Sequence, residues 1–309
     1  MKILSKNNLS NKMFFSAVLI LSGVIIVLVS KYWLVMWLGL ELNLLGFILI
    51  LEKSNEEFYK IVKYFIIQSV ASIVISMSFF LKNSVEGGLM FSLSMTMIFA
   101  LFLKLAVAPL HFWIVPLVKK MKNMNLFLIL GLQKLAPMFI FSKISIFFKT
   151  NTMFWGISAL LGSILGLFSS SMNLILLFSS ISHSPWMMML MFSNSPNFWF
   201  IYFLVYLLNL SMVLFFSQEN KYKLLMFLSL LSMGGLPPLL GFYVKWVAIF
   251  YNFASLTIIL LLLSSIMNMY MYIRISIKSL LNLKNISKKI MESKSFLPMF
   301  FFTPIMFFL

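Results

Sequence analysis

Long apolar runs separated by short polar segments organise this chain. Eleven runs are long enough for a helix to cross the hydrocarbon layer of a membrane, which takes about 20 residues. They lie at residues 13–30, 32–51, 64–81, 89–118, 124–142, 152–168, 171–192, 198–216, 224–253, 255–273 and 295–309. The pattern predicts an all-α polytopic membrane protein with about 11 transmembrane helices.

Two of these runs, 89–118 and 224–253, are too long for one simple span, and both contain prolines, among them Pro109 and Pro237. Interrupted backbone is tolerated at membrane depth where protein or a wet cavity covers it. We therefore expect each run to form one broken helix. Broken helices in two distant parts of a chain are typical of repeat-built transporters, so antiporter-like inverted repeats are predicted.

Composition agrees with a membrane protein and excludes a soluble one. Of the 309 residues 62% are hydrophobic and 10% are charged, whereas soluble domains carry about 25% charged residues. The gaps between runs are short, so we expect a single transmembrane domain over residues 1–309 and no soluble domain. The first run lacks a small-residue cleavage site, which favours a retained span over a signal peptide.

The net charge of +17 is distributed asymmetrically between the two sides that eleven spans would define. The side of the N-terminus holds 17 Lys and Arg residues, and the opposite side holds four. This bias predicts an N-terminus on the cytoplasm-like side, with the C-terminus opposite. Because the lysines flank apolar runs, they do not indicate a nucleic-acid partner.

The residue types restrict the chemistry that this chain can perform. It has no cysteine, no aspartate and two histidines, and it contains no glycine-rich nucleotide motif. Iron–sulfur clusters, thiolate metal sites and bound nucleotides are therefore not expected in this chain.

Four titratable residues, Glu41, Lys104, Lys134 and Lys245, fall inside apolar runs. Each costs on the order of 3 kcal/mol near the bilayer centre, so stability does not explain them. One alternative is buried salt bridges that register helices, and another, for Lys245, is snorkelling to an interface. Burial favours a neutral amine and a nearby carboxylate favours a charged one, so moving the partner can switch the group. This property suits a proton relay.

The backbone near the buried lysines is also unusual. Pro109 and Pro137 are each expected to free a main-chain carbonyl beside the preceding buried lysine. Glycines and prolines at 234–241 are expected to break the helix before Lys245.

The remaining polar residues in the apolar runs allow more than one interpretation. His183 lies among serines and is either a relay member or a satisfied polar residue that holds helices together. His111 and Trp113 are interpreted as interfacial anchors, and Lys63 as the flank of a span.

Six segments occur in an order and spacing that is similar to a known family. They are WLGLELN at 37–43, KYFIIQ at 63–68, KLAVAPLHFW at 104–113, QKLAP at 133–137, the segment around His183, and GGLPPLLGF followed by KW at 234–246. Together they resemble chain 2 of mitochondrial NADH:ubiquinone oxidoreductase, an antiporter-like family of membrane subunits in respiratory complex I.

The resemblance implies a subunit of an H+-translocating NADH:ubiquinone reductase, in the mitochondrial inner membrane with its N-terminus in the matrix. It implies that Glu41 and Lys104 form the pair at which protons enter the relay, and that Lys134 is the connecting lysine. Lys245 is then the lysine at which protons leave, and His183 can join the relay. Flavin, iron–sulfur clusters and ubiquinone are then expected in partner subunits, with other membrane-arm subunits and lipid as neighbours. The alternatives are a stand-alone monovalent cation/proton antiporter and a structural membrane scaffold.

Overall fold

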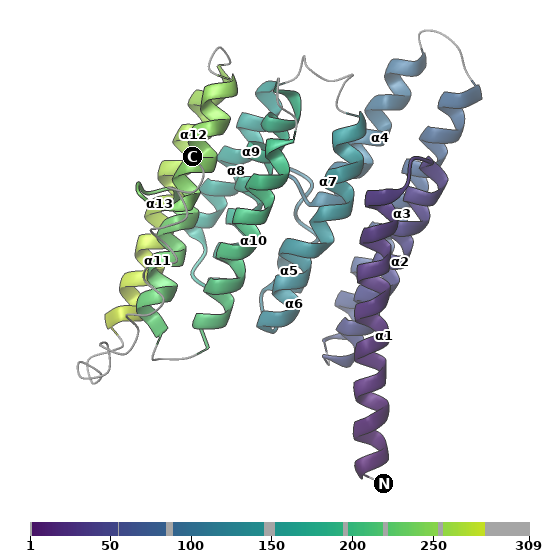
Figure 1. Cartoon of the computed structure of the whole chain (residues 1–309), viewed down its shortest axis with the longest axis horizontal. Helices are drawn as coiled ribbons and strands as arrows, with labels where there is room; N and C mark the ends of the chain where they lie inside the picture. The colour runs from purple at the N-terminus through teal and green to yellow at the C-terminus, as the bar shows by residue number, and fades with distance from the viewer. Residues whose placement is uncertain are drawn as a thin grey trace. The chain divides into compact units, whose positions relative to one another are not determined.

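The computed structural model describes residues 2–54, 56–84, 89–144, 152–193, 197–218, 222–252 and 256–281. Every regular element in these ranges is a helix (Figure 1). Eight of the eleven predicted runs fall wholly within them, the runs 224–253 and 255–273 do so except for one end residue each, and the run 295–309 lies outside the described residues. The chain divides into two compact units, residues 1–148 and 149–309.

The first unit contains most of the predicted N-terminal spans as helices. Its elements are α1 (Lys2–Val29), α2 (Trp33–Lys53), α3 (Phe58–Ser84), α4 (Leu89–Leu105), α5 (Val115–Val118), α6 (Asn123–Phe127), the π-helical turn η1 (Leu128–Leu132) and α7 (Gln133–Ile144). Helix α3 begins six residues before the predicted run because polar residues also form helix there, with Lys60 paired to Glu57 at 3.1 Å. Half-buried Lys63 therefore lies within α3 rather than at its flank.

The predicted break in 89–118 is confirmed. Helix α4 ends at Leu105, where Ala106 adopts a positive φ of 53°. The amides of Ala106 and Val107 donate to the carbonyls of Leu103 and Phe102, which is a Schellman cap. Pro109 lies in the turns beyond this cap, so the helix has already ended before the proline.

Helices α1 and α2 pack closely because glycines lie between them. A Cβ atom at Gly23 would lie 2.7 Å from the carbonyl oxygen of Gly39, and one at Gly46 would lie 2.9 Å from that of Ser16. Small residues allow this close approach of helix backbones in membranes. The contact holds α2, which carries Glu41, against α1.

The second unit contains α8 (Thr152–Phe168), α9 (Met172–Phe192), α10 (Phe198–Phe216), α11 (Lys223–Gly234), α12 (Leu240–Asn252) and α13 (Thr257–Leu281). Helix α9 contacts α8, α10, α12 and α13, and 94% of its most apolar 18-residue window is buried. The break predicted in 224–253 is confirmed by the gap between α11 and α12, where Gly235 has a φ of 90°.

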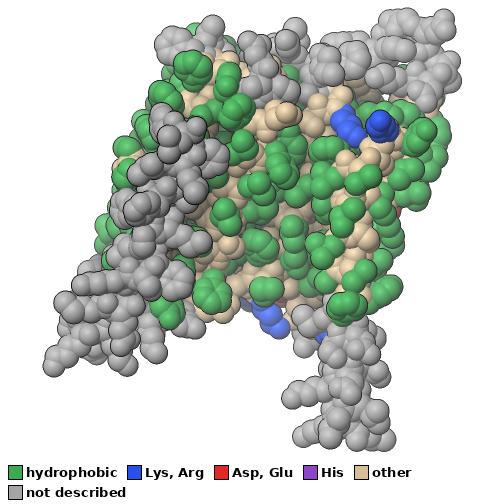
Figure 2. All heavy atoms as spheres, viewed as in Figure 1, with side chains coloured by type: hydrophobic (Ala, Val, Ile, Leu, Met, Phe, Trp, Pro, Cys, Tyr) green, Lys and Arg blue, Asp and Glu red, His purple; other side chains and the backbone are tan. Residues whose placement is uncertain are grey.

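Six helices in the described ranges are long and apolar enough to cross a membrane. Hydrophobic side chains dominate the face shown in Figure 2, with few Lys or Arg among them. The chain is a multi-pass, all-α membrane protein.

Candidate functional site

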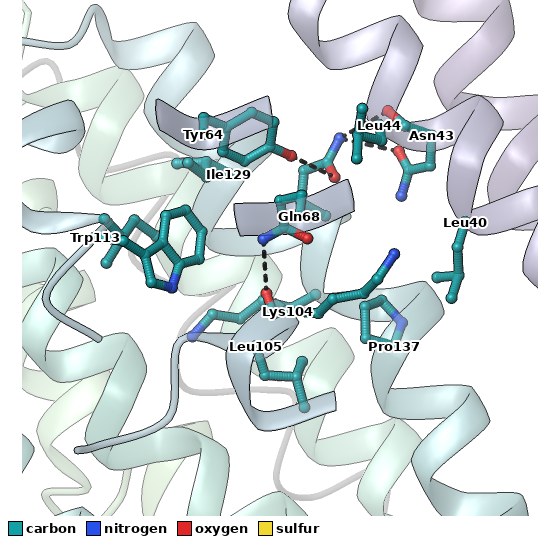
Figure 3. A pocket seen from close by; sticks show the side chains of 13 residues that line it. Leu40, Asn43, Leu44, Tyr64, Gln68, Lys104, Leu105, Trp113, Ile129 and Pro137 are labelled. Atoms are coloured by element: carbon teal, nitrogen blue, oxygen red, sulfur yellow. Dashed lines mark hydrogen bonds between the residues drawn. The ribbon is translucent and has the colours of Figure 1, made fainter. Parts of the chain in front are cut away.

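A cavity of about 20 Å³ lies inside the first unit, between α2, α3, α4 and the helix that contains η1 (Figure 3). Its lining includes Asn43, Tyr64, Gln68, Lys104, Trp113, Gln133 and Lys134. A water molecule needs about 10–15 Å³ and two or more polar partners. The cavity therefore has the size and the polar lining to hold one.

Two predicted relay residues, Lys104 and Lys134, line this cavity and are buried, with 7% and 5% of their surface exposed. Lys104 lies in the last turn of α4, directly before the Schellman cap, and Lys134 lies at the start of α7. The structure thus brings together two lysines that are 30 positions apart in the sequence.

The helix that carries Lys134 contains two features that alter its backbone. Pro137 lies inside α7 and has no amide hydrogen for the carbonyl of Gln133, and the π-helical turn Leu128–Leu132, which was not predicted, ends two residues before Lys134. π-Helical turns inside helices widen the backbone and are frequent at functional sites.

Gln133 joins three helices around the cavity, a role that the sequence did not reveal. Its Nε2 atom donates to Oδ1 of Asn43 at 3.0 Å and to the main-chain oxygen of Asn43 at 3.3 Å. The hydroxyl of Tyr64 donates to Oε1 of Gln133 at 3.4 Å. Uncharged groups from α2, α3 and α7 thus form a connected polar network beside the two lysines.

Gln68 satisfies a carbonyl at the end of α4. Its Nε2 atom donates to the main-chain oxygen of Lys104 at 3.3 Å, as the dashed line in Figure 3 shows. The last carbonyls of a helix have no partner within it, so Gln68 substitutes for the missing one. This bond holds the main chain of Lys104 in place, and with it the start of the side chain that carries the amine.

Glu41 lies on α2 next to this cavity but does not line it. Its side chain is half-buried, and its buried Oε1 atom meets no hydrogen-bond donor among the described residues. The ion pair that the described residues show joins Lys60 and Glu57. Glu41 and Lys104, although both lie near the cavity, do not form a static salt bridge with each other.

A second, smaller cavity of about 10 Å³ lies inside the second unit, which is close to the lower limit for one water molecule. Its lining consists of His183, Tyr202, Val205, Tyr206, Asn209, Met233, Gly241, Val244 and Lys245. Helices α9, α10, α11 and α12 all contribute to it. The predicted residues Lys245 and His183 thus share one cavity.

The amine of Lys245 caps the broken end of α11. Its Nζ atom donates to the main-chain oxygen atoms of Met233 and Gly234, at 3.1 and 2.5 Å. Gly235 makes room for it, because a Cβ there would lie 3.1 Å from Nζ and the φ of 90° disfavours other residues. With 6% of its surface exposed, Lys245 does not snorkel to an interface.

His183 is held between two tyrosine hydroxyls. Its Nδ1 atom lies 2.8 Å from the hydroxyl of Tyr202, and its Nε2 atom lies 3.4 Å from that of Tyr272. Both tyrosines are buried, at 2% and 0% exposed. The structure thus satisfies His183, as one interpretation of the sequence expected, and it also links the imidazole to the second cavity.

Two interpretations of the sequence need correction. His111 and Trp113 are buried, at 2% and 7% exposed, and Trp113 lines the first cavity. An interfacial anchor must reach the lipid headgroups, so the interpretation of these residues as interfacial anchors is wrong.

Within the described ranges, no three His, Asp or Glu side chains gather into a metal site.

Comparison with known proteins identifies the family. Residues 30–223 match the family described as NADH:quinone oxidoreductase/Mrp antiporter, TM. The protein named NADH-ubiquinone oxidoreductase chain 2 from Artemia franciscana is 35% identical, over 96% of this chain and 98% of that protein. The chain belongs to the NADH-ubiquinone oxidoreductase chain 2 family. A member of this chain 2 family from Anopheles gambiae is 32% identical over 87% of this chain and 85% of its own length.

Two solved structures share the fold of this chain. A chain of respiratory complex I from Thermus thermophilus with bound Aureothin superposes with a TM-score of 0.77 at 18% identity, covering 86% of this chain and 70% of that one. A chain of the Mrp complex from Dietzia sp. DQ12-45-1b gives a TM-score of 0.73 at 17% identity, over 84% and 59% of the two chains. At these low sequence identities, the comparison shows that the fold is shared.

Proposed function

We propose that this chain is a membrane subunit of respiratory complex I that moves protons across the mitochondrial inner membrane, coupled to NADH oxidation and ubiquinone reduction in other subunits. Membership of the chain 2 family supports this function over a stand-alone antiporter. Its relatives carry the name of the oxidoreductase, and the T. thermophilus chain belongs to a complex I structure.

The observation that carries the proposal is the pair of buried lysines, Lys104 and Lys134, on one water-sized cavity. A proton can pass between two amines when water or a polar group lies within hydrogen-bond reach of both. Glu41 forms no salt bridge with Lys104, and a carboxylate that approaches an amine favours its charged form, so movement of Glu41 toward or away from Lys104 would change how tightly the amine holds its proton. Lys134 would then accept the proton.

Lys245 is the proposed output residue in the second unit, and His183 is a further member of the relay there. Lys245 holds its amine on two main-chain oxygens at the helix break. These neutral acceptors favour the charged amine less than a carboxylate would. Lys245 can therefore lose its proton without first moving away from a negatively charged partner.

The remaining parts of the proposal follow the family and the charge bias. The two units act as one transmembrane domain without a soluble domain, and the N-terminus lies in the matrix. Other membrane-arm subunits and lipid surround the chain. The flavin, iron–sulfur clusters and ubiquinone belong to partner subunits, and electrons do not pass through this chain.

The central experiment is Lys104→Met in the assembled complex, reconstituted in vesicles. We expect NADH-driven proton pumping to fall by about tenfold or more, because methionine has a similar length but carries no proton. Lys120→Met is the matched control, since Lys120 is exposed outside the cavities. A complex with Lys104→Met that assembles and pumps the normal number of protons per NADH would falsify the proposal.

The alternative function is distinguished by purifying the chain alone. A stand-alone cation/proton antiporter would exchange cations for protons in vesicles that contain no other subunit. We expect no exchange from the isolated chain, and co-purification with the NADH-oxidising assembly from native membranes.

A further inference from the structure

Tyr202 occupies a position that the relay of charged residues does not explain. It lies on α10, is 2% exposed, and contacts both His183 and the second cavity. A buried tyrosine needs a hydrogen-bond partner for its hydroxyl, and His183 provides one at 2.8 Å. The same side chain also lines the cavity, together with His183 and Lys245, so Tyr202 contacts both the imidazole and a water-sized space.

We propose that the hydroxyl of Tyr202 is the proton link between Lys245 and His183, acting through one water molecule in the second cavity. The link rests on the proposed function, because it extends the relay of Lys245. The Nζ of Lys245 donates two of its three hydrogens to the oxygens of Met233 and Gly234. The third hydrogen remains for the cavity that Lys245 lines.

The transfer conserves protons and charge at each atom. Charged Lys245 gives one proton to the water, and the water gives one to the oxygen of Tyr202. In the same step the original hydroxyl proton of Tyr202 moves to Nδ1 of His183. Lys245 ends neutral, Tyr202 and the water end unchanged, and His183 ends as an imidazolium. The reverse sequence returns the proton.

Tyr272 prepares His183 for this step from the other side of the ring. Neutral imidazole carries a hydrogen on one nitrogen and accepts at the other. In the tautomer that the step requires, Nε2 carries the hydrogen and donates to the Tyr272 hydroxyl 3.4 Å away, and Nδ1 accepts from Tyr202. Tyr272 is therefore a positioning residue for the imidazole, while Tyr202 carries the proton.

The surroundings suit a neutral hydroxyl link better than a further charge. The hydroxyl of Ser232 donates to Oδ1 of Asn209 at 2.6 Å, and the amide of Asn268 donates to Ser182 at 2.7 Å. The first pair holds Asn209, which lines the cavity, and the second holds Ser182, the residue before His183. A link that begins and ends neutral avoids placing a permanent charge among them.

The test is Tyr202→Phe in the assembled complex, which removes one oxygen and keeps the ring. We expect NADH-driven proton pumping to slow by about tenfold or more, since a positioned proton-transfer group contributes about 100-fold or more to its step. We also expect a larger effect of D2O on pumping, because the slowed proton step limits the rate. A merely structural role of Tyr202 would leave the D2O effect unchanged.

Tyr270→Phe is the matched control, because Tyr270 is 61% exposed on α13. If the Tyr202→Phe complex pumps protons at the same rate as the Tyr270→Phe complex and shows the same D2O effect, the link is overturned. If Tyr202→Phe prevents assembly, Val205→Ile tests the same link by filling the cavity that the water occupies. Normal pumping by that variant would overturn it as well.

Lys245→Met separates this inference from the proposed function. Reduced pumping in Lys245→Met together with normal pumping in Tyr202→Phe overturns the tyrosine link alone. Normal pumping in both variants overturns the output role of Lys245 and the link together. Reduced pumping in both, with the raised D2O effect in Tyr202→Phe, supports both.

Discussion

The amine of buried Lys245 is held by neutral groups, because it donates to two main-chain oxygens. The main chain of Lys104 is also held by a neutral group, since its carbonyl accepts from Gln68. Main-chain and amide partners orient a residue without fixing its charge, whereas a carboxylate in contact would stabilise the charged amine strongly. The geometry therefore suits residues that gain and lose protons.

Gln133 is the residue whose loss should loosen the first cavity most directly. Gln133→Leu removes the donor to Asn43 and the acceptor for Tyr64, leaving buried polar groups without partners. We expect the free energy of unfolding to fall by about 1–2 kcal/mol. The measurement is the temperature at which the chain leaves the purified complex on native gels.

Thr96→Val serves as the control for Gln133→Leu. Thr96 is exposed, and its hydroxyl donates to a carbonyl of its own helix at 2.9 Å. Equal dissociation temperatures for the two variants would show that the Gln133 bridge contributes nothing.

The sequence identified Lys104, Lys134 and Lys245 as buried because a charge inside an apolar run is conspicuous. It did not identify Gln133 or Tyr202, because their partners, Asn43 and His183, lie on other helices. Tyrosine is also common at membrane interfaces, so its residue type alone carries little information. The roles of Gln133 and Tyr202 depend on which face of the helix is buried.

At the scale of elements, the two helix breaks were predictable and the π-helical turn was not. Glycine and proline pairs mark the break before α12, where Gly235 supplies the positive φ. The end of α4 uses Ala106 at positive φ, which is uncommon for alanine. The turn Leu128–Leu132 contains apolar residues and one glycine, and this composition does not distinguish it from an ordinary α-helix.

The contact between α1 and α2 gives a prediction at this scale. A side chain at Gly39 would meet Cγ2 of Val27 at 2.7 Å and the oxygen of Gly23 at 2.8 Å. We expect Gly39→Leu to separate the helices and to reduce the amount of assembled complex severalfold, because overpacking costs about 1–3 kcal/mol. The abundance of the complex on native gels measures this effect.

Leu38→Val is the neighbouring control, since Leu38 is 44% exposed on the same helix. Normal assembly of Gly39→Leu would mean that α1 and α2 can move apart without consequence for the chain. The position of Glu41 on α2 would then not depend on this contact.

At the scale of the whole molecule, the charge bias predicts which side each loop faces. Because the chain contains no cysteine, one introduced cysteine labels one loop. We expect Lys120→Cys to react with a membrane-impermeant thiol reagent from the matrix side, and Tyr32→Cys to react from the opposite side. Both positions are exposed.

Labelling of this chain is measured as a mass shift in inside-out and right-side-out vesicles. Reaction of both cysteines from the same side would contradict the predicted number of spans between them. Reaction with both sides exchanged would place the N-terminus outside the matrix.

Helix α9 has a consequence for how the chain is made. It has the lowest mean hydropathy of the six long apolar helices, and nearly all of its central residues are covered by protein in the finished fold. During synthesis it enters the bilayer before α10, α12 and α13 exist. Its serine hydroxyls do not need partners from other helices at that stage. Ser179, Ser180 and Ser182 each donate to the carbonyl three residues earlier in the same helix. The helix thus brings its own hydrogen-bond partners for these hydroxyls, and biogenesis need not wait for the neighbours that later enclose it.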